Sequence, residues 1–562
     1  MAEYEQLLEQ SIWDITRDHV TFPDPRQIKL SYERARTICR HSGMTVDDIL
    51  NLRPRFWEFH RHFVTTKDYS VTTTLAIHWN LCIGTIAKFA HGRKDLQPLL
   101  QDLLSFNVCG EYLLTEIGHG LDARNLETTA TLKPDGSFEL HTPNKAAAKA
   151  MPPTTPWAGV PRVGVVFARL LSNDVDCGVK PFIVKLCDAT QMCPGVISRP
   201  LPVRNGARAL DHSITTFNHV QLPPGSLLGP AELASKPRID FLTQIWRVSV
   251  GTLSLSLLNI PALRQSAFIA GTYSIRRHVG SNVGSVTVPI ISFATQYRPV
   301  LAALVQASAF DAFADDAIKT FCDDSLALQV RHAVASCFKA TVTLGTQTTL
   351  TELADRCGWQ GLFAYNRIIE SAQSLRGNSI AEGDYTVLCI RLVSEVLLGR
   401  YKLPESKMKD CRLAKHEAGV WREAQEMMTS LVVNGHRDDA YNTYILPRSR
   451  ALVEATGHRM AYEAAFTGGK CTPEVLALFE SICVMSDLSW YCEYEEVSRK
   501  VLLSEDARAA EALLPQLVTL LQETKAQPWT TAPILEEKKW DEFLRILPAF
   551  QHAARDLEKA SL

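Results

Sequence analysis

The chain has 562 residues, which is enough for several domains with sizeable hydrophobic cores. Its 59 Lys and Arg residues nearly balance its 61 Asp and Glu residues, and the net charge of -2 argues against nucleic acid or an anionic membrane as the main partner. The 14 cysteines are scattered and form no C-x-x-C pair. This spacing favours reduced, mostly buried thiols over a disulfide framework or a zinc site.

Targeting signals are weak at both ends of the sequence. Residues 1–10 are acidic and contain no apolar core of a secretory signal, and no apolar run is long enough for a transmembrane helix. Ser561 stands where a C-terminal peroxisomal address needs a basic residue. We therefore expect an intracellular protein, cytoplasmic or peroxisomal.

Helical signals dominate residues 1–110. Asp24 before Pro25 predicts a helix start, with the aspartate as N-cap and the proline at the first helical position. Residues 73–87 form a largely apolar stretch interrupted by Gly84, and leucines recur at helical spacing between residues 95 and 106. We expect an N-terminal helical domain.

Residues 111–232 show the alternation and turn signals that are typical of strands. The alternating or apolar runs lie at residues 138–142, 163–171, 182–186 and 213–222. We expect a compact, mainly antiparallel β-domain.

The helical pattern returns from residue 233 and persists to the end of the chain. Predicted helices cover residues 241–258, 300–313, 326–342, 386–398, 417–432, 473–485, 507–523 and 534–560. A loop at residues 401–411 separates an expected helical bundle (233–402) from an expected C-terminal helical domain (403–562). The predicted fold is thus mainly α with a central β-domain.

The most informative motif reads T-E-I-G-H-G at residues 115–120 and continues as L-E-T-T-A-T at residues 126–131. Gly118 and Gly120 have no Cβ, so backbone can approach a flat ligand closely at these positions. A polar turn between two elements would also explain an isolated motif of this kind. His119 has no second His or Cys at ligand spacing, so we expect no metal site.

A second motif, Glu382-Gly383-Asp384, precedes an apolar helix. Asp384 suits a helix N-cap, and Gly383 suits a strained backbone. Neither structural role requires Glu382, whose carboxylate could act as a general base.

These two motifs, in this order, resemble those of the acyl-CoA oxidases and acyl-CoA dehydrogenases, with the oxidase branch as the closer match. The order of helices, β-domain, bundle and additional C-terminal helices is similar over nearly the whole chain. The resemblance implies the acyl-CoA dehydrogenase fold with a barrel-like β-domain, FAD as cofactor and a homodimer. It also implies an oxidoreductase that removes an α-proton and a β-hydride from an acyl-CoA thioester and passes electrons to O2.

The resemblance also implies roles for single residues. Glu382 corresponds to the base that removes the α-proton. Thr115 corresponds to the threonine that hydrogen-bonds the flavin ring, and Gly118 and Gly120 preserve the conformation of its loop. Thr154 and Asp384 are further expected cofactor contacts.

A second set of residues is similar to family segments that bind the dinucleotide part of FAD. Tyr273 to Arg277 resembles a motif that sends an arginine to the pyrophosphate, and Arg277 is the first choice before Arg276. Two arginines at a helix end could equally form a solvated face favoured by the helix dipole. Gln296 is the glutamine retained from a Y-Q-T-Q-like motif. Gly358 and Gly361 lie in a C-G-W-Q-G run that resembles the loop meeting the neighbouring subunit's FAD.

Departures from the family pattern leave the substrate open. Residues 149–154 read K-A-M-P-P-T where oxidases of β-oxidation have K-W-W-P-G-G, and Trp359 replaces a loop glycine. A second hypothesis therefore keeps the flavin and Glu382 but assigns a non-CoA or carrier-bound specialised metabolite, oxidised or oxygenated. A third hypothesis, a scaffold without activity, is opposed by the presence of Glu382 and Thr115.

Overall fold

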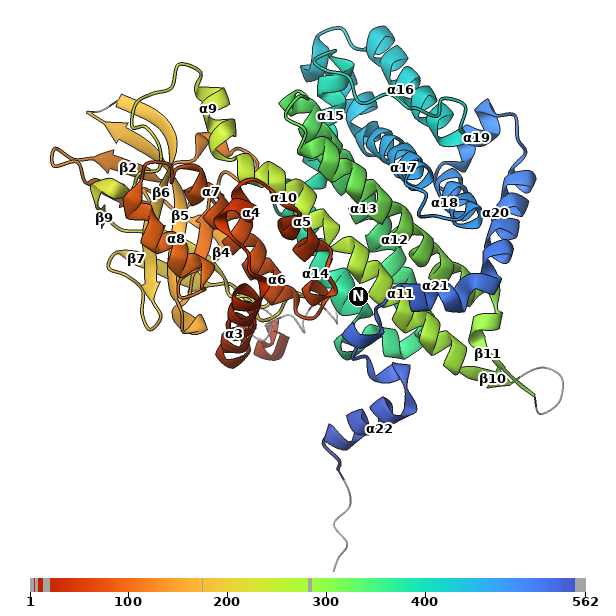
Figure 1. Cartoon of the computed structure of the whole chain (residues 1–562). Coiled ribbons are helices and arrows are strands. Elements are labelled where there is room, and N and C mark those ends of the chain that lie inside the picture. The colour runs from red at the N-terminus through yellow and green to blue at the C-terminus, as the bar shows by residue number, and fades with distance from the viewer. Residues whose placement is uncertain (1–4, 6–8, 14–20, 174, 281–285, 551–562) are drawn as a thin grey trace, which may run out of the picture.

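The computed structural model describes residues 5, 9–13, 21–173, 175–280 and 286–550. Figure 1 shows a β-domain on the left, short N-terminal helices beside it, and long helices that lead to a C-terminal helical region on the right. The architecture is mainly α with a central β-domain, as predicted. The bounds of the four predicted domains remain predictions.

The N-terminal part of the chain folds into helices. They are α3 (Pro25–Ser42), α4 (Val46–Leu50), α5 (Pro54–Arg61), α6 (Tyr69–Leu75), α7 (Gly84–Lys88) and α8 (Gln97–Leu104). Asp24 caps α3 by accepting a hydrogen bond from the N–H of Arg26 at 2.9 Å, which confirms the predicted helix start. Between α6 and α7, Ala76–Ile83 forms a π-helical segment, a wider turn that is frequent at functional sites.

The β-domain contains nine strands among the described residues. They are β1 (Cys109–Leu113), β2 (Thr129–Leu132), β3 (Phe138–His141), β4 (Lys149–Pro153), β5 (Pro161–Ser172), β6 (Val175–Asp188), β7 (Val196–Pro200), β8 (His212–Phe217) and β9 (Val220–Leu222). One sheet has the order β1-β5-β2-β3-β9, with β6 also paired to β5, and a smaller sheet has the order β4-β8-β7. Most pairs are antiparallel, as predicted, but β1 and β2 both run parallel to β5.

The central helices begin after the β-domain. They are α9 (Pro237–Gln244), α10 (Trp246–Leu257), α11 (Asn259–Arg276), α12 (Ala294–Phe321), α13 (Leu328–Arg356), α14 (Ile368–Ile380) and α15 (Tyr385–Leu397). Pro261 lies in the first turn of α11, where a missing N–H costs no helical hydrogen bond. A hairpin of β10 (His278–Gly280) and β11 (Thr287–Pro289) interrupts the region predicted as purely helical.

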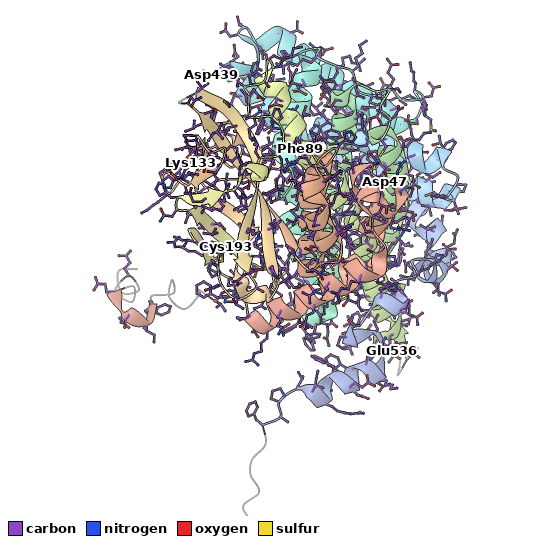
Figure 2. All side chains as sticks on the ribbon, turned by 60° about the vertical axis from the view of Figure 1, so that its left-hand side comes forward. Asp47, Phe89, Lys133, Cys193, Asp439 and Glu536 are labelled. Atoms are coloured by element: carbon purple, nitrogen blue, oxygen red, sulfur yellow. The ribbon has the colours of Figure 1, made fainter. Side chains whose placement is uncertain are left out.

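The C-terminal helices are α16 (Arg412–Leu431), α17 (Ser449–Thr467), α18 (Pro473–Ser486), α19 (Leu488–Tyr494), α20 (Arg499–Leu513), α21 (Leu517–Glu523) and α22 (Glu537–Ile546). In Figure 2, Glu536 marks the point where α22 leaves the body of the molecule. The helix predicted for residues 534–560 begins later, at Glu537, and ends earlier, at Ile546. Residues 551–560 lie outside the described part of the chain.

All 14 cysteines are unpaired. Considering only the described ranges, we find no single helix that is long and apolar enough to cross a membrane. Two bent helix pairs, Pro237–Gln244 with Trp246–Arg276 and Pro473–Ser486 with Leu488–Tyr494, reach that length and composition together.

Candidate active site

Glu382 lies in the loop between α14 and α15. Its backbone is in the left-handed region, with φ 53°, and Gly383 follows with φ 102°. A left-handed conformation is uncommon for a residue with a side chain and persists only where the surroundings hold it. Asp384 ends the loop by accepting hydrogen bonds from the N–H groups of Thr386 and Val387 at 2.9 and 3.2 Å, so it is the N-cap of α15 as predicted.

Two helices hold this strained loop through its backbone oxygens. The buried Lys339 of α13 donates from Nζ to the carbonyl oxygens of Ala381 and Gly383, both at 2.6 Å. The hydroxyl of Thr252, in α10, donates to the carbonyl oxygen of Glu382 at 2.8 Å. Three successive carbonyl groups are therefore fixed by side chains from outside the loop.

The Glu382 carboxylate is held between the π-helical segment and α10. Nδ2 of Asn80 donates to Oε2 of Glu382 at 2.8 Å and to the carbonyl oxygen of Arg247 at 3.0 Å. Arg247 completes the link, because its Nε donates to the carbonyl oxygen of Asn80 at 2.9 Å. A Cβ atom on Gly251 would lie 1.2 Å from Oε2, so this position accepts the carboxylate only because it is glycine.

The surroundings of Glu382 favour its protonated form. Burial raises the pKa of Glu382 to about 8, although Lys339, Asn80 and Arg247 act in the opposite direction. Asn80 Oδ1, Arg247 Nη2 and the Tyr112 hydroxyl are buried and have no hydrogen-bond partner among the described residues. Buried orphaned polar atoms are costly, so this region is suited to bind polar groups of a ligand. A carboxyl group with a raised pKa in such a place is what a general base requires.

The T-E-I-G-H-G motif contains both a buried structural residue, Glu116, and an exposed residue, Thr115. Glu116 is fully buried and accepts hydrogen bonds from the N–H of Glu127 at 2.7 Å, from the N–H of Thr128 at 2.9 Å and from Nζ of Lys149 at 2.9 Å. Burial raises the pKa of Glu116, but Lys149 and these N–H groups lower it overall. Glu116 therefore ties the two halves of the motif together, while Thr115 is exposed.

The two motif glycines have different surroundings. A Cβ on Gly118 would lie 2.9 Å from the Cβ of Ala146, so packing alone explains this glycine. Nothing lies within 4 Å of a Cβ built on Gly120, so packing does not require this glycine.

The segment that replaces K-W-W-P-G-G forms strand β4. Met151 is 50% exposed, has φ 77°, and lies at an irregularity in the pairing of β4 with β8. The Thr154 hydroxyl is buried and shares hydrogen bonds with the hydroxyls of Ser198 and Thr215, both at 2.7 Å. This leaves only the backbone of Thr154 for the predicted contact with a cofactor.

The second set of predicted residues lies near the far end of α11. Nη1 of Arg276 donates to the carbonyl oxygen of Ile534 at 3.0 Å. Arg277 is exposed, and we find no hydrogen bond from its side chain to a described residue. Gln296 accepts a hydrogen bond from the Ser274 hydroxyl at 3.5 Å. Arg277 is therefore better placed than Arg276 to bind an anion.

Gly358 and Gly361 follow α13. A Cβ on Gly361 would lie 1.8 Å from the carbonyl oxygen of Ala354, so close packing requires this glycine. Gly358 has φ 58° and open space around it. Trp359, which replaces a loop glycine, contacts Trp540 of α22, with ring centroids 6.2 Å apart. The replacement therefore adds a contact with this C-terminal helix.

The structure separates the predicted residues into two groups. Gly251, beside Glu382, lies in the first half of α10, and Arg277 follows the end of α11; the two nearly continuous helices cross the molecule in Figure 1. At 1.5 Å per residue, this separation is about 40 Å. Arg277 is therefore too far from Glu382 of the same chain to bind the pyrophosphate of a flavin that reaches Glu382.

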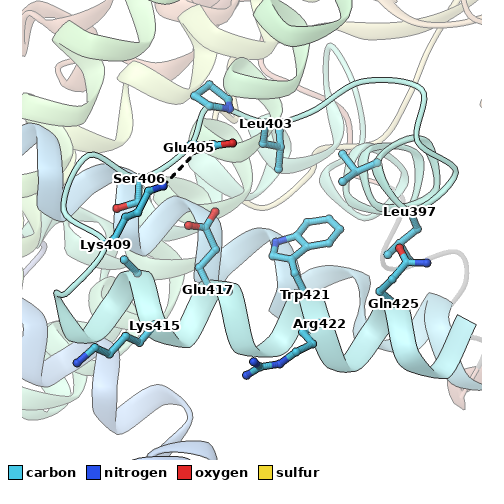
Figure 3. A pocket seen from close by; sticks show the side chains of 14 residues that line it. Leu397, Leu403, Glu405, Ser406, Lys409, Lys415, Glu417, Trp421, Arg422 and Gln425 are labelled. Carbon is cyan, nitrogen blue, oxygen red and sulfur yellow. Dashed lines mark ion pairs between the residues drawn. The ribbon is translucent and has the colours of Figure 1, made fainter.

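A cavity of about 580 Å³ lies elsewhere, between the end of α15, the loop before α16, and α16 itself. Figure 3 shows Glu417 and Trp421 pointing into it from α16, whereas Lys415 and Arg422 point away. Glu417 is already paired with Arg459 at 2.7 Å. We do not include this cavity in the candidate site. In the parts of the chain that the structure describes, no group of three or more His, Cys, Asp or Glu residues could hold a metal ion.

The residues that surround Glu382 were not predicted from sequence. Asn80, Gly251, Thr252 and Lys339 belong to no recognised motif. The available signals were a lysine in the otherwise uncharged stretch Val334–Gly345 and a glycine inside the apolar helix of residues 241–258.

The chain is similar in sequence to acyl-CoA oxidases. Residues 253–397, which include Glu382, match the family described as acyl-CoA oxidase, C-alpha1 domain. The peroxisomal acyl-coenzyme A oxidase 1 of Arabidopsis thaliana is 27% identical over 402 residues, which are 64% of this chain and 58% of that protein. The chain thus spans just over half the length of the curated relatives it matches.

Solved structures show the same fold over a greater length. Acyl-CoA oxidase 1 of Yarrowia lipolytica superimposes with a TM-score of 0.79 at 19% identity, covering 99% of this chain and 91% of that chain. Acyl-CoA oxidase-2 of Caenorhabditis elegans, bound with FAD, ascaroside-CoA and ATP, gives a TM-score of 0.71 at 17% identity and covers 94% and 93% of the two chains. The chain has the fold of the acyl-CoA oxidases, and its residues 253–397 match the family model of their C-alpha1 domain.

Proposed function

We propose that the chain is an FAD-dependent acyl-CoA oxidase that desaturates an acyl-CoA thioester, with Glu382 as the base that removes the α-proton. The observation that carries this proposal is the Glu382 carboxylate, whose pKa is raised to about 8 and which is held against Gly251 inside the segment that matches the C-alpha1 domain. The curated relatives are acyl-CoA oxidases, which favours an acyl-CoA over a free specialised metabolite as substrate.

The residues present fit FAD in two half-sites. Thr115 is exposed in the same loop as Gly120, which has open space around it. Arg277 is exposed at the end of α11, where Ser274 is hydrogen-bonded to Gln296. FAD, when bound, supplies the acceptor for the β-hydride. Arg and backbone N–H groups are the usual ligands of a pyrophosphate, so the donors of the second half-site match that part of the cofactor.

The backbone of the Glu382 loop suits it to stabilise developing negative charge. The N–H of Glu382 makes no hydrogen bond to a described residue, whereas the carbonyl groups of residues 381–383 are all occupied. This N–H can therefore donate to the thioester oxygen as the α-proton leaves, which stabilises the enolate. The carboxylate of Glu382 accepts the proton in the same step.

The raised pKa predicts how the reaction depends on pH. Below the pKa of about 8, Glu382 is mostly protonated and cannot accept the α-proton. The rate of substrate-driven flavin reduction should therefore rise with pH, by about tenfold per unit well below the pKa, and level off above it. Anaerobic single-turnover bleaching across a pH series measures this rate. A rate that falls as the pH increases through this range would contradict the assignment of Glu382 as the base.

A direct experiment tests the proposed function as a whole. The purified protein should be yellow, and its flavin band should bleach under anaerobic conditions with at least one member of a series of butyryl-, octanoyl- and palmitoyl-CoA. Admission of O2 should then restore the band and release H2O2. A yellow protein that none of these substrates bleaches would favour the alternative, a non-CoA or carrier-bound metabolite. Protein that cannot take up FAD would refute both.

We further propose that two copies of the chain share each FAD. The separation of about 40 Å between Arg277 and the Glu382 site of the same chain supports this arrangement, because Arg277 of one copy can then serve the Glu382 site of the other. Trp359, Leu362 and Phe363, next to Gly358, are large apolar side chains that are 58%, 69% and 48% exposed, and such a patch is typical of an interface.

Replacement of the two arginines should separate their roles. Arg277→Gln should weaken FAD binding by about ten- to a hundredfold, because a charge-assisted hydrogen bond to the pyrophosphate is lost. Arg276→Gln should mainly lower stability, because Arg276 is bonded to Ile534. Equilibrium titration of apoprotein with FAD measures both effects. Equal losses in the two variants would contradict this ranking.

Mixed dimers test the sharing itself. A dimer of one Glu382→Gln copy and one Arg277→Gln copy contains one site with both replacements and one with neither, if the half-sites come from different chains. Such mixed dimers should recover about half of the wild-type activity at limiting FAD. Mixed dimers in which no site has both wild-type residues would stay inactive, and that outcome would show that each copy binds FAD alone.

The electron acceptor and the compartment follow from the same proposal. The relatives are named oxidases, and several of them are named peroxisomal. We therefore propose O2 as the acceptor and an intracellular location, with the peroxisome as the first compartment to examine.

A further inference from the structure

Lys339 is a buried lysine beside the loop that carries Glu382, and burial lowers its pKa to about 8, although Glu382 and Asp384 act in the opposite direction. It lies in the middle of α13 and is 0% exposed. Its Nζ donates to the carbonyl oxygens of Ala381 and Gly383 at 2.6 Å. A buried ammonium group is costly unless opposite charge and hydrogen bonds compensate for it. Among the described residues, the hydrogen-bond partners of Nζ are carbonyl groups and not carboxylates.

The charged and titratable groups around Glu382 come from four elements. Lys339 of α13, Arg247 of α10 and Tyr112 of β1 interact electrostatically with the carboxylate, and Asp384, at the start of α15, acts on Lys339. Two of them are cations that oppose the effect of burial on Glu382, and Lys339 has the larger influence. Arg247 contacts the base only indirectly, through Asn80.

We propose that Lys339 is a positioning residue that holds the backbone on both sides of Glu382 and stabilises the carboxylate form of this base. The inference rests on the proposed function of Glu382. It extends that function by proposing that Lys339, on a different helix and 43 positions earlier in the sequence, controls the protonation of the Glu382 carboxyl group.

Thr252 allows the two parts of this role to be separated. Its hydroxyl holds the carbonyl oxygen of Glu382, as Lys339 holds the neighbouring carbonyls, but Thr252 carries no charge. Thr252→Val removes the hydrogen bond at nearly constant volume. Lys339→Met removes both the hydrogen bonds and the charge.

The charge of Glu382 can be measured without substrate. The FAD-containing protein is titrated with pH, and the infrared band of the protonated carboxyl group is followed. Subtraction of the same titration of Glu382→Gln isolates the Glu382 band. Lys339→Met should raise the midpoint by about one pH unit or more. Thr252→Val should leave the midpoint within about 0.3 units of wild type.

A matched control uses another buried lysine. Lys180 of β6 is 1% exposed and pairs with Asp240 at 3.1 Å, outside the contacts of the Glu382 loop. Lys180→Met should therefore lower stability without moving the midpoint. If Lys339→Met does not fold, Lys339→Gln keeps an N–H donor for the carbonyl oxygens while removing the charge, and it should raise the midpoint in the same way.

The outcomes separate this inference from the proposed function. A Lys339 variant that folds, binds FAD and keeps the wild-type midpoint would overturn the role of Lys339. Failure of butyryl-, octanoyl- and palmitoyl-CoA to bleach the wild-type flavin would count against the proposed function, and the infrared midpoint would still decide the role of Lys339. If both hold, the pH profile of bleaching by the active acyl-CoA should move upward in Lys339→Met and not in Thr252→Val.

Discussion

Glu382→Gln is expected to abolish substrate-driven flavin reduction while the protein keeps its fold and its FAD. The amide is nearly isosteric with the carboxyl group and can still accept the hydrogen bond from Asn80, which is 2.8 Å long in the wild-type protein. It cannot accept the α-proton. General bases contribute on the order of a hundred- to ten-thousand-fold to rate, so the loss should be evident in single-turnover anaerobic bleaching.

The competing interpretation treats Glu382 as a structural loop residue. In that case, the Glu382→Gln protein would reduce its flavin at nearly the wild-type rate, and only replacement of the neighbouring N-cap, Asp384, would lower stability. Asp384→Ala removes that cap and should lower the free energy of unfolding by about 1 kcal/mol, measured by thermal or urea denaturation. Near-normal bleaching of Glu382→Gln by an acyl-CoA that bleaches wild type would sink the catalytic assignment, but not the fold.

Gly251→Ala should slow substrate-driven reduction of the flavin by about a hundredfold, because it displaces the base without removing it. The added Cβ would lie 1.2 Å from Oε2 of Glu382, so the carboxylate has to move. A shift of this kind in a reacting group costs about a hundredfold in rate. Single-turnover bleaching at saturating substrate measures the loss, and the FAD spectrum should remain that of wild type.

Gly271→Ala is the matched control for this substitution. Gly271 lies farther along the same helical run, in α11, and its Cβ would crowd the methyl groups of Leu521 at 2.8 Å. This replacement should lower thermal stability and leave the rate per bound flavin unchanged. Equal losses of rate in the two variants would show that general damage to the helix, and not displacement of Glu382, explains the result.

Local patterns in the sequence predicted most of the fold. Asp24 and Asp384 act as the expected N-caps, and the alternating stretches became strands β3, β5, β6, β8 and β9, because capping and hydrophobic period depend on residues close in sequence. The β10–β11 hairpin was missed, since three-residue strands give almost no periodic signal. The parallel pairing of β5 with β1 and β2 was also invisible, because strand order is a tertiary property.

The candidate site was only partly predictable, because its parts come from distant helices. Asn80 is 302 residues from Glu382 in sequence, and Thr252 is 130 residues away. No local pattern links residues at such separations. Gly84, which interrupts an apolar stretch, has its explanation only in three dimensions: a Cβ there would lie 2.3 Å from Nε of Arg247. Arg247 in turn orders Asn80 beside the base.

The π-helical segment Ala76–Ile83 makes the length of this part of the chain as important as its composition. His78 contacts the carbonyl oxygen of Leu103 and the N–H of Gly110, and Asn80, two residues later, reaches the base. Deleting one residue would return the segment to a regular α-helix, in which successive side chains diverge by about 100° instead of the smaller angle of the wider π turn, so His78 and Asn80 would point in different relative directions. The two residues could then not both keep their partners. A single-codon deletion here should therefore be far more damaging than one in the exposed loop at residues 399–411, where a change in length alters no helical register.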